Sequence, residues 1–416
     1  MKRRETIQYL ALSSASFFTS IDVDKKLVNS NWLAENKPPR KNYDYILLYW
    51  MPYDNNLSRF GQPIIEMLSK GVQSDKVLVL VQSDLSNAKQ LSRNIITKGN
   101  INVQYLETAD SSSENVLNDY LSWALSQFQA KHWVIVFLGH GESLMKISPD
   151  HNPNSSSISS SEPKWMDLLR VSEVLSKFNQ AVNGRLELLF FQNCNRGNIE
   201  VHYTFQNIAK YTLSSQMRLA VPNYYYESLL NHLSYYPNLD GGQIAKKIMD
   251  FEPSDMYHSL TLTKNHYFHQ LSEKLNPVID SILRANTDAV KIQINSALFP
   301  KKSNSEKSLI EIYRSGGETF VDLANFILEI TILSGADVIA CNRFLNYFKS
   351  FLIERVQQNG KLLNPRIRGR YQKFSGLGLF LPRTRQELET YSYLKIYSDL
   401  KLVKLFEAVV FDPEKN

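Results

Sequence analysis

Cysteine is scarce in this sequence, with two residues, Cys194 and Cys341, among 416. Two cysteines far apart in the chain cannot build a disulfide framework, and no CxxC pair offers a zinc site. Each cysteine therefore needs its own explanation. Cys341 lies in an apolar segment of helical period, ADVIACNRFLNYF, where a thiol packs as a small hydrophobic side chain.

Long apolar runs and clustered charges are also missing. No stretch of about 18 apolar residues is present, so no membrane-spanning helix is expected. Lysine and arginine outnumber aspartate and glutamate by 47 to 41, but they are scattered, and no basic run typical of nucleic-acid binding appears. What is present is 43% hydrophobic residues, enough for a large buried core and too many for a disordered chain.

Residues 1–42 are predicted to be an N-terminal extension or export signal plus a linker. The first twenty residues combine a basic start, a short apolar stretch and small residues, and the Arg3-Arg4 pair resembles a twin-arginine export signal. The apolar stretch is interrupted by polar residues, however, and no A-x-A cleavage site follows. Export and a cytoplasmic location both stay open.

From residue 43 onward, short apolar runs alternate with segments of helical period. Strands of five to seven residues alternating with helices of ten to fifteen indicate βαβ units and a parallel sheet. We therefore predict an α/β fold, doubly wound and mostly parallel, over residues 43–262. Residues 263–416 are predicted to be mainly helical, with an apolar run at 376–382 that could rejoin the sheet. The expected strands are 43–50, 76–84, 132–141, 185–197 and 217–223.

Two of these strands end in reactive side chains. VIVFLGHG delivers His140 and then Gly141, and LELLFFQNC delivers Cys194. The carboxyl ends of parallel strands lie at one edge of a sheet, where ligands bind, so the imidazole and the thiol are predicted to meet. The imidazole can take the thiol proton and later protonate a leaving amine. The N–H groups of Gly141 and Cys194 could bind the developing oxyanion.

Alone, a strand-end cysteine or a His-Gly pair is commonly structural, and it is the joint occurrence that predicts nucleophilic catalysis. The helix expected directly after Cys194 would favour the thiolate further through its dipole.

The order of motifs resembles that of the clostripain-like (C11) cysteine peptidases, members of the caspase-like clan. The caspase-type Q-A-C-x-G signature, with a histidine about 50 residues upstream, is matched in part by the run QNCNRG around Cys194. The resemblance covers roughly residues 44–400 and implies a caspase-like fold and a cysteine endopeptidase acting on proteins or peptides. It is carried by LLYWMPYDNNLSRF (47–60), VLVLVQSD (77–84), FLGHG (137–141), TFVDLANF (319–326) and FSGLGLFLP (374–382).

The resemblance also implies a pocket for the residue before the scissile bond. Members of the family cleave after Arg or Lys, using one acidic residue two positions before the nucleophile and another some 28 residues beyond it. Here those places hold Gln192 and the segment ending at Asn223, so a buried basic side chain would lack a charge partner, and a non-basic preference is possible. Gln192 instead matches a caspase position that helps to hold an aspartate. Further pocket candidates are Asp54, Arg59 and Glu227.

Similar enzymes are zymogens that cut themselves in the loop after the catalytic histidine. The segment 148–164 is rich in serine, asparagine and proline and is predicted to be a long polar loop. Lys146 and Lys164 flank it and are candidate autoprocessing sites if basic specificity holds.

Calcium is implied by the resemblance only, because some family members need it. Asp54, Asp84 and Asp150 offer carboxylates, but without EF-hand spacing. No metal ligands are therefore assigned from the sequence, and the thiol chemistry itself needs no cofactor.

Two other interpretations stay open beside a general endopeptidase. One is a caspase-like bacterial defence effector that cuts a single dedicated partner protein. The other is a catalytically silent caspase-fold binding module, against which the presence of both His140 and Cys194 argues. A nucleotide-binding α/β protein is disfavoured, because neither GxGxxG nor GxxxxGK[ST] follows any strand.

Overall fold

The computed structural model describes residues 41–86, 88–151, 162–300, 308–360 and 374–411. The extension predicted over 1–42 lies outside these ranges except for its last two residues, so its export signal stays a prediction. Of the helices within these ranges, none combines the length and the apolar composition that crossing a lipid bilayer requires.

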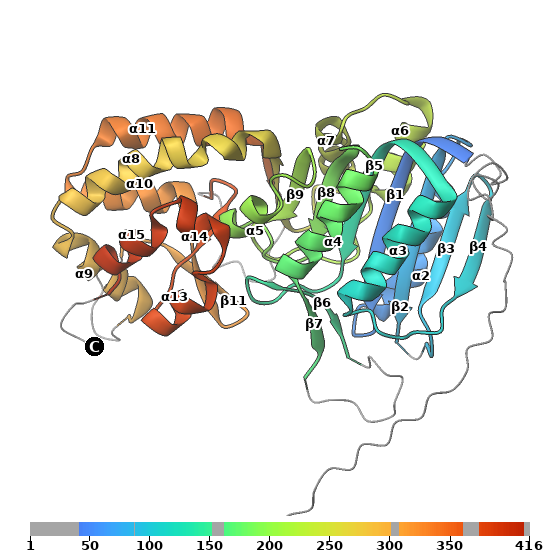
Figure 1. Cartoon of the computed structure of the whole chain (residues 1–416), viewed down its shortest axis with the longest axis horizontal. Helices are drawn as coiled ribbons and strands as arrows, with labels where there is room; N and C mark the ends of the chain where they lie inside the picture. The colour runs from blue at the N-terminus through green and yellow to red at the C-terminus, as the bar shows by residue number, and fades with distance from the viewer. Residues whose placement is uncertain (1–40, 87, 152–161, 301–307, 361–373, 412–416) are drawn as a thin grey trace, which may run out of the picture. The chain divides into compact units, whose positions relative to one another are not determined.

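Nine strands form the central sheet of the described chain (Figure 1). They are Lys41–Tyr53 (β1), Val77–Leu85 (β2), Ser92–Thr97 (β3), Asn100–Tyr105 (β4), Phe128–Leu138 (β5), Leu186–Gln192 (β8), Tyr211–Ser215 (β9), His258–Lys264 (β10) and Ile353–Asn359 (β13). Their order is β13-β10-β9-β8-β5-β1-β2-β3-β4. Neighbours are parallel from β2 to β9 and antiparallel at both edges. The central strands are buried on both faces, which explains their continuous apolar runs.

Helices cover both faces of this sheet and confirm the predicted α/β class. Successive side chains of a strand point to opposite faces, and in β1 Ile46 joins one apolar core while Leu47 joins the other. Figure 1 shows α3 and α4 on the nearer face. The helices are Glu114–Gln127 (α3) and Leu168–Ala181 (α4) on that face, and Gly61–Gly71 (α2), Tyr225–Tyr235 (α6) and Gly241–Phe251 (α7) on the other.

The chain after β10 is mainly helical, as predicted. The apolar core on the α3–α4 side continues into this region without a break. Cys341 lies there, on the helix Val338–Tyr347, and is fully buried. The helices are Leu271–Arg284 (α8), Asp288–Leu298 (α9), Leu323–Ser334 (α10), Val338–Tyr347 (α11), Arg385–Tyr391 (α13), Lys395–Asp399 (α14) and Leu402–Val409 (α15), with shorter helical segments at Asn265–Gln270 (η2) and Phe348–Leu352 (η3). One more short segment, Ser58–Phe60 (η1), directly precedes α2.

The apolar run at 376–382 does not enter the central sheet. It contributes β14 (Gly378–Phe380), which pairs with β12 (Glu318–Asp322) in a three-stranded sheet completed by β11 (Ile312–Ser315). The segment that does rejoin the central sheet is β13, antiparallel to β10. The sequence of β13, IERVQQN, is largely polar, so no apolar run marks it as a strand.

The strand expected at 217–223 is also displaced. Its place in the sheet is taken by β9, whose buried hydroxyl groups find partners inside the protein: Ser214 Oγ lies 2.6 Å from His202 Nε2. The segment 148–164 begins in β6 (Lys146–Asp150) and ends at the first residue of β7 (Lys164–Asp167), and these two strands are antiparallel. Of the residues between them, 152–161 lie outside the described ranges.

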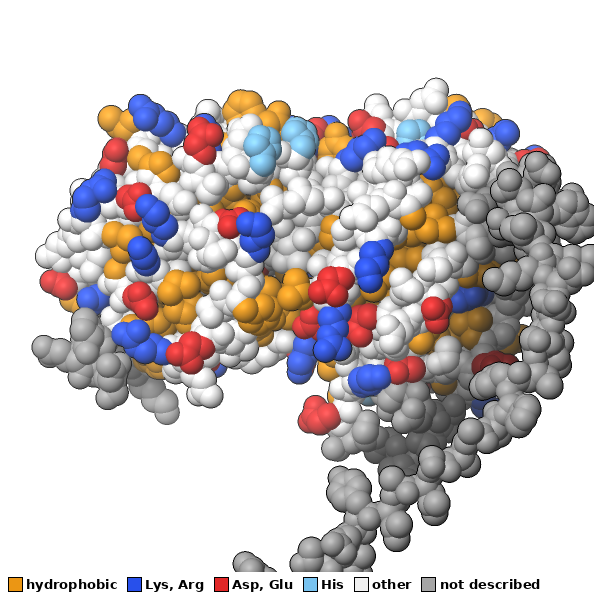
Figure 2. Space-filling view, viewed as in Figure 1, with side chains coloured by type: hydrophobic (Ala, Val, Ile, Leu, Met, Phe, Trp, Pro, Cys, Tyr) orange, Lys and Arg blue, Asp and Glu red, His pale blue; other side chains and the backbone are white. Residues whose placement is uncertain are grey.

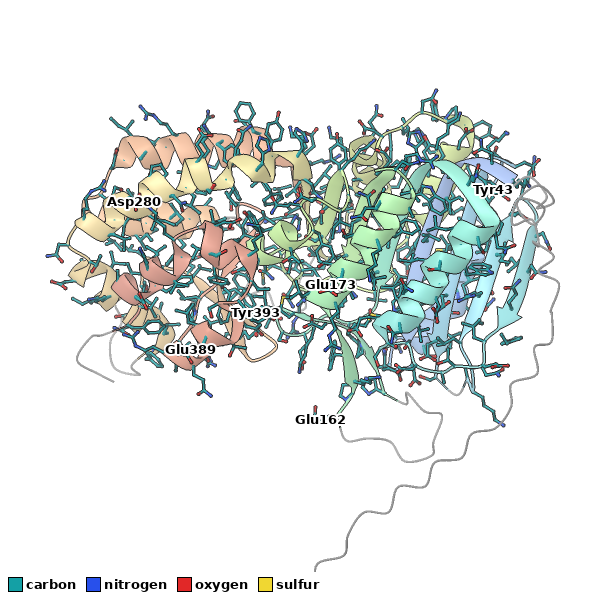
Figure 3. The ribbon with its side chains drawn as sticks, viewed as in Figure 1. Tyr43, Glu162, Glu173, Asp280, Glu389 and Tyr393 are labelled. Carbon is teal, nitrogen blue, oxygen red and sulfur yellow. The ribbon has the colours of Figure 1, made fainter. Side chains whose placement is uncertain are left out.

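Positive and negative side chains are mixed on the molecular surface. Figure 2 shows lysine and arginine interspersed with aspartate and glutamate over the visible face. Several are paired; Asp280, labelled in Figure 3, lies 2.6 Å from Lys401 Nζ. Exposed pairs of this kind contribute little to stability, so the surface charge carries no argument about the fold.

Candidate active site

The two reactive residues come from neighbouring strands. Strands β5 and β8 are parallel partners, and their register pairs Leu138 with Gln192. His140 and Cys194 each lie two residues beyond that pair, so they emerge at the same edge of the sheet. Both side chains are partly accessible to solvent. The structure therefore brings together the two residues that the sequence singled out.

A tight turn after β8 presents the thiol. Asn195 adopts a left-handed backbone with φ of 56°, and its N–H donates to Met217 O at 3.0 Å. The Cys194 Sγ accepts from the N–H of Leu219 at 3.5 Å. The helix expected directly after the cysteine begins only at Ile199 (α5, Ile199–Thr204), so this turn, and not a helix N-terminus, surrounds the sulfur.

The imidazole is held by a residue to which the sequence gave no role. His140 Nε2 lies 2.8 Å from Oδ1 of Asn56, in the segment after β1. An amide oxygen only accepts, so Nε2 carries the proton and Nδ1 is the basic atom of the neutral ring. Burial, with a smaller contribution from His151, lowers the pKa of His140 and favours that neutral form. Asn56 stands in the motif YDNN, but nothing in the sequence around it distinguishes it from an ordinary loop asparagine.

The turns that follow β5 and β8 are linked directly. Asn193 Nδ2 donates to Gly139 O at 2.9 Å and to His140 O at 3.3 Å. A Cβ on Gly141 would lie 2.6 Å from the carbonyl oxygen of Cys194, so only glycine fits there. Among the described residues, neither Gly141 N–H nor Cys194 N–H donates to a protein acceptor. Both remain available to a substrate oxygen.

The predicted pocket residues Gln192 and Asn223 contact each other directly. Gln192 Nε2 donates to Asn223 Oδ1 at 2.6 Å and to Tyr226 OH at 2.7 Å, and its Oε1 accepts from Tyr225 OH at 2.7 Å. Gln192 and Asn223 are both buried. Both side-chain N–H groups of Gln192 are thus already used within the protein, so this uncharged amide is held in place.

A carboxylate that the sequence does not single out lies next to the Gln192–Asn223 pair. Glu252, at the end of α7, accepts from Asn223 Nδ2 at 3.0 Å and from Tyr224 N at 3.3 Å. Burial raises its pKa to about 7. Nothing in the sequence points to it, because it follows Cys194 by 58 residues (252 − 194) and belongs to no motif.

The other pocket candidates make contacts with other parts of the described chain. Arg59 is exposed and places its guanidinium over the ring of Phe60, 4.7 Å from the centroid. Glu227 is an exposed residue of α6 whose backbone packs against Gly71. Asp54 joins a different group of acidic residues.

That group consists of Asp54, Asp84 and Asp150, each offering an oxygen within 4.8 Å of the others. All three are buried, and Ser111 donates through Oγ to Asp84 at 2.8 Å and through N to Asp150 at 2.7 Å. Burial, then the neighbouring Asp150, raises the pKa of Asp84 to about 8. An all-oxygen set of carboxylates fits calcium. The three come from the ends of β1, β2 and β6, which no local spacing reveals.

The two candidate autoprocessing lysines differ in their surroundings. Lys146 starts β6, and its carbonyl accepts from Arg196 Nη1 at 3.2 Å, directly before the buried Ile147. Lys164 starts β7, and its exposed ammonium lies 2.6 Å from Asp110.

Comparisons with known proteins agree with this geometry. The family model described as the clostripain family matches residues 49–407. A solved structure of an inactive zymogen C11 protease from Parabacteroides distasonis superposes with a TM-score of 0.62 at 16% identity, covering 86% of this chain and 99% of that one. A secreted C11 cysteine protease from Bacteroides thetaiotaomicron, solved with an irreversible peptide inhibitor, gives 0.63 at 18% identity, with the same coverages of 86% and 99%. Among curated proteins, none matches.

The structural similarities confirm the predicted fold, and the family match extends over most of the chain. This chain belongs to the clostripain family (C11) of cysteine peptidases.

Proposed function

We propose that the chain is an endopeptidase in which Cys194 attacks the peptide carbonyl and His140 transfers the protons. The observation that carries this proposal is the pairing of Leu138 with Gln192, which puts both residues two positions past adjacent parallel strand ends. The alternative of a silent binding module gives no reason for a neutral imidazole and a thiol at one edge of the sheet.

The proposed reaction begins when the thiol proton moves to His140 as Sγ forms a bond to the carbonyl carbon. The oxygen that becomes negative accepts from the N–H groups of Gly141 and Cys194. As the C–N bond breaks, the imidazolium returns its proton to the leaving amine. Water, deprotonated by the same imidazole, then releases the acid and the free thiol. Asn56 keeps the ring oriented throughout.

Labelling with a thiol-reactive peptide tests this assignment. We expect wild type to be labelled at Cys194, Cys194→Ala to be unlabelled and His140→Ala to be labelled far more slowly. Cys341→Ala is the matched control, because it removes the other thiol from a buried helix position and should react as wild type does. Equal labelling of wild type and His140→Ala would rule out the dyad.

For specificity, we propose that the pocket beside Cys194 prefers an uncharged side chain. Its floor is the hydrogen-bonded pair Gln192–Asn223, which is neutral. Glu252 lies behind Asn223 and already accepts two hydrogen bonds, so it supports the floor instead of facing a substrate cation. A peptide library with a varied residue before the scissile bond measures the preference. Best cleavage after Arg or Lys, lost in Glu252→Gln, would show instead that Glu252 is the pocket acid.

Self-processing is proposed within 148–164 and not after Lys146. The Lys146 carbonyl is held by Arg196 at the first residue of β6, and the bond after it leads into the strand, where a protease cannot bind it without disrupting these contacts. Incubated wild type should yield two fragments, whereas Cys194→Ala should stay intact. Sequencing the new N-terminus locates the cut, and a start at Ile147 would contradict the proposal.

We further propose that the acidic cluster of Asp54, Asp84 and Asp150 holds calcium. The fit rests on three buried carboxylates that lie close enough to share one ion. The cation would neutralise their mutual repulsion and connect the ends of three strands. No step of the peptide cleavage involves it.

A further inference from the structure

A fully buried arginine lies two residues after the nucleophile. The side chain of Arg196 has no exposed surface. A guanidinium has five N–H groups, and here each donates to a backbone carbonyl. Nε donates to Cys194 (3.2 Å), Nη1 to Leu144 (2.9 Å) and Lys146 (3.2 Å), and Nη2 to Glu142 (3.0 Å) and Ser143 (2.8 Å).

Four of these five bonds go to one short segment, residues 142–146. That segment follows His140 and Gly141 directly, and the fifth bond returns to the Cys194 turn. One rigid, planar group therefore connects the turn that carries the base to the turn that carries the nucleophile. Asn193 links the same two turns near Gly139, so Arg196 fixes the far end of the histidine loop.

Burying this charge is costly. Burial lowers the pKa of Arg196 to about 10, and the carboxylate of Glu318 is the largest influence that opposes the shift. An apolar side chain of similar length would fill the space without that desolvation. The charge therefore serves its hydrogen bonds, and those bonds order the histidine loop.

The mainly helical region holds the other side of this loop. Glu318, on β12, accepts from Leu144 N at 2.7 Å and from the hydroxyl of Tyr391. A Cβ on Gly316 would lie 2.6 Å from the backbone of Glu142, so the β11–β12 turn packs directly on the loop.

We propose that Arg196 is a positioning residue for catalysis: it fixes the loop after His140, and so places the imidazole and the Gly141 N–H relative to the Cys194 sulfur. The inference rests on the proposed cysteine–histidine mechanism. Arg196 touches no reacting atom in that mechanism, and it acts through the backbone of 142–146.

Arg196→Met is the direct test, since it keeps length and packing but removes all five donors. We expect kcat to fall about 100-fold, the loss typical of a misplacement near 1 Å, with KM changed little. Activity is divided by the fraction of correctly folded protein, taken from the unfolding transition. Arg196→Lys retains three donors and should recover part of kcat.

Arg185 supplies a matched control, because it directly precedes β8 and so lies at the opposite end of the strand that leads to Cys194. It too donates to backbone carbonyls, to Val182 at 2.7 Å and Ala130 at 2.8 Å, but far from the turns that carry His140 and Cys194. Arg185→Met should lower the melting temperature and leave kcat per folded molecule at the wild-type value. An equal loss of kcat in Arg185→Met would show that general destabilisation, and not positioning, explains the effect.

Wild-type kcat per folded molecule in Arg196→Met would overturn the inference. If Arg196→Met does not fold, Arg196→Lys decides, because wild-type kcat in that variant would show that the full set of five bonds is unnecessary. Failure of the underlying mechanism looks different: wild type itself would then resist labelling at Cys194.

Discussion

Replacing Gly141 by alanine tests how tightly the turns that carry His140 and Cys194 are packed. The added methyl group would lie 2.6 Å from the Cys194 carbonyl oxygen, 3.1 Å from Arg196 Nε and 3.3 Å from Asn193 Cβ. Ordinary contact begins near 3.4 Å, so the turns must separate by about 0.8 Å (3.4 − 2.6). The nearest atom belongs to the backbone and Arg196 is fixed by five bonds, so no flexible side chain can move aside.

A separation of that size displaces both the imidazole and the Gly141 N–H from the Cys194 sulfur. Because a misplacement of 1 Å can cost about 100-fold in rate, we expect kcat to fall on the order of 30- to 100-fold while KM changes little. Overpacking also lowers the free energy of unfolding, by about 1–3 kcal/mol. Initial rates on a fluorogenic peptide, divided by the titrated active-site concentration, separate the two effects.

Gly184→Ala is the control. Gly184 has φ of +70°, and no atom lies within 4 Å of an added Cβ. It precedes β8, at the opposite end of that strand from Cys194. It should lose about 1 kcal/mol from backbone strain and keep wild-type kcat. If Gly141→Ala also kept wild-type kcat, the turns would have room to spare, and the argument from their close contact would be refuted.

Three further predictions follow from other buried groups. Burial lowers the pKa of His202 to about 3, so between pH 6.5 and 3 the unfolded chain gains this proton and the folded protein does not. The free energy of unfolding therefore falls by about 1.4 kcal/mol for each pH unit that the pH is lowered. Denaturant titrations from pH 7 to 4 should show this slope reduced in His202→Gln, and an identical slope would contradict the prediction. Calcium at 100 times its Kd should raise the free energy of unfolding of wild type by about 2.7 kcal/mol and that of Asp84→Asn much less. Thermal unfolding with and without a chelator measures this difference. Equal shifts in melting temperature in the two proteins would place the ion elsewhere. The double variant Gln192→Asp/Asn223→Asp makes the proposed pocket floor anionic. The ratio of kcat/KM for a peptide with Arg before the scissile bond to kcat/KM for a peptide with an uncharged residue there should rise at least about tenfold. An unchanged ratio would mean that these two residues do not contact that side chain.

The strands that carry the reactive residues could be predicted because they are buried on both faces. Such strands read as continuous apolar runs, and β1, β5 and β8 appear within a few residues of their expected limits. The parallel order of these strands then places His140 beside Cys194 without any contact information. Local pattern therefore sufficed for the half of the site that lies on strand ends.

The remaining features depend on contacts between distant segments. Strand β9 contains Thr212, Ser214 and Ser215, all fully buried, so it has no apolar pattern to recognise. Its position is set by pairing with β8 and β10 and by the bond from Ser214 to His202. Glu252 is likewise recognised only by its hydrogen bond from Asn223, and no spacing in the sequence connects these two residues.

The helical region is needed for the site as well as for the fold. Residue 262 is the predicted boundary between the α/β and the mainly helical regions, yet β13 pairs with β10 and one apolar core runs through both regions. Glu318 and Gly316, both beyond that residue, hold the loop that follows His140. Removing them would expose a sheet edge and core side chains and release one side of that loop at the same moment. The segment 43–262 alone would keep the bonds from Asn56, Asn193 and Arg196, but it would lose the contacts that hold the outer side of the histidine loop.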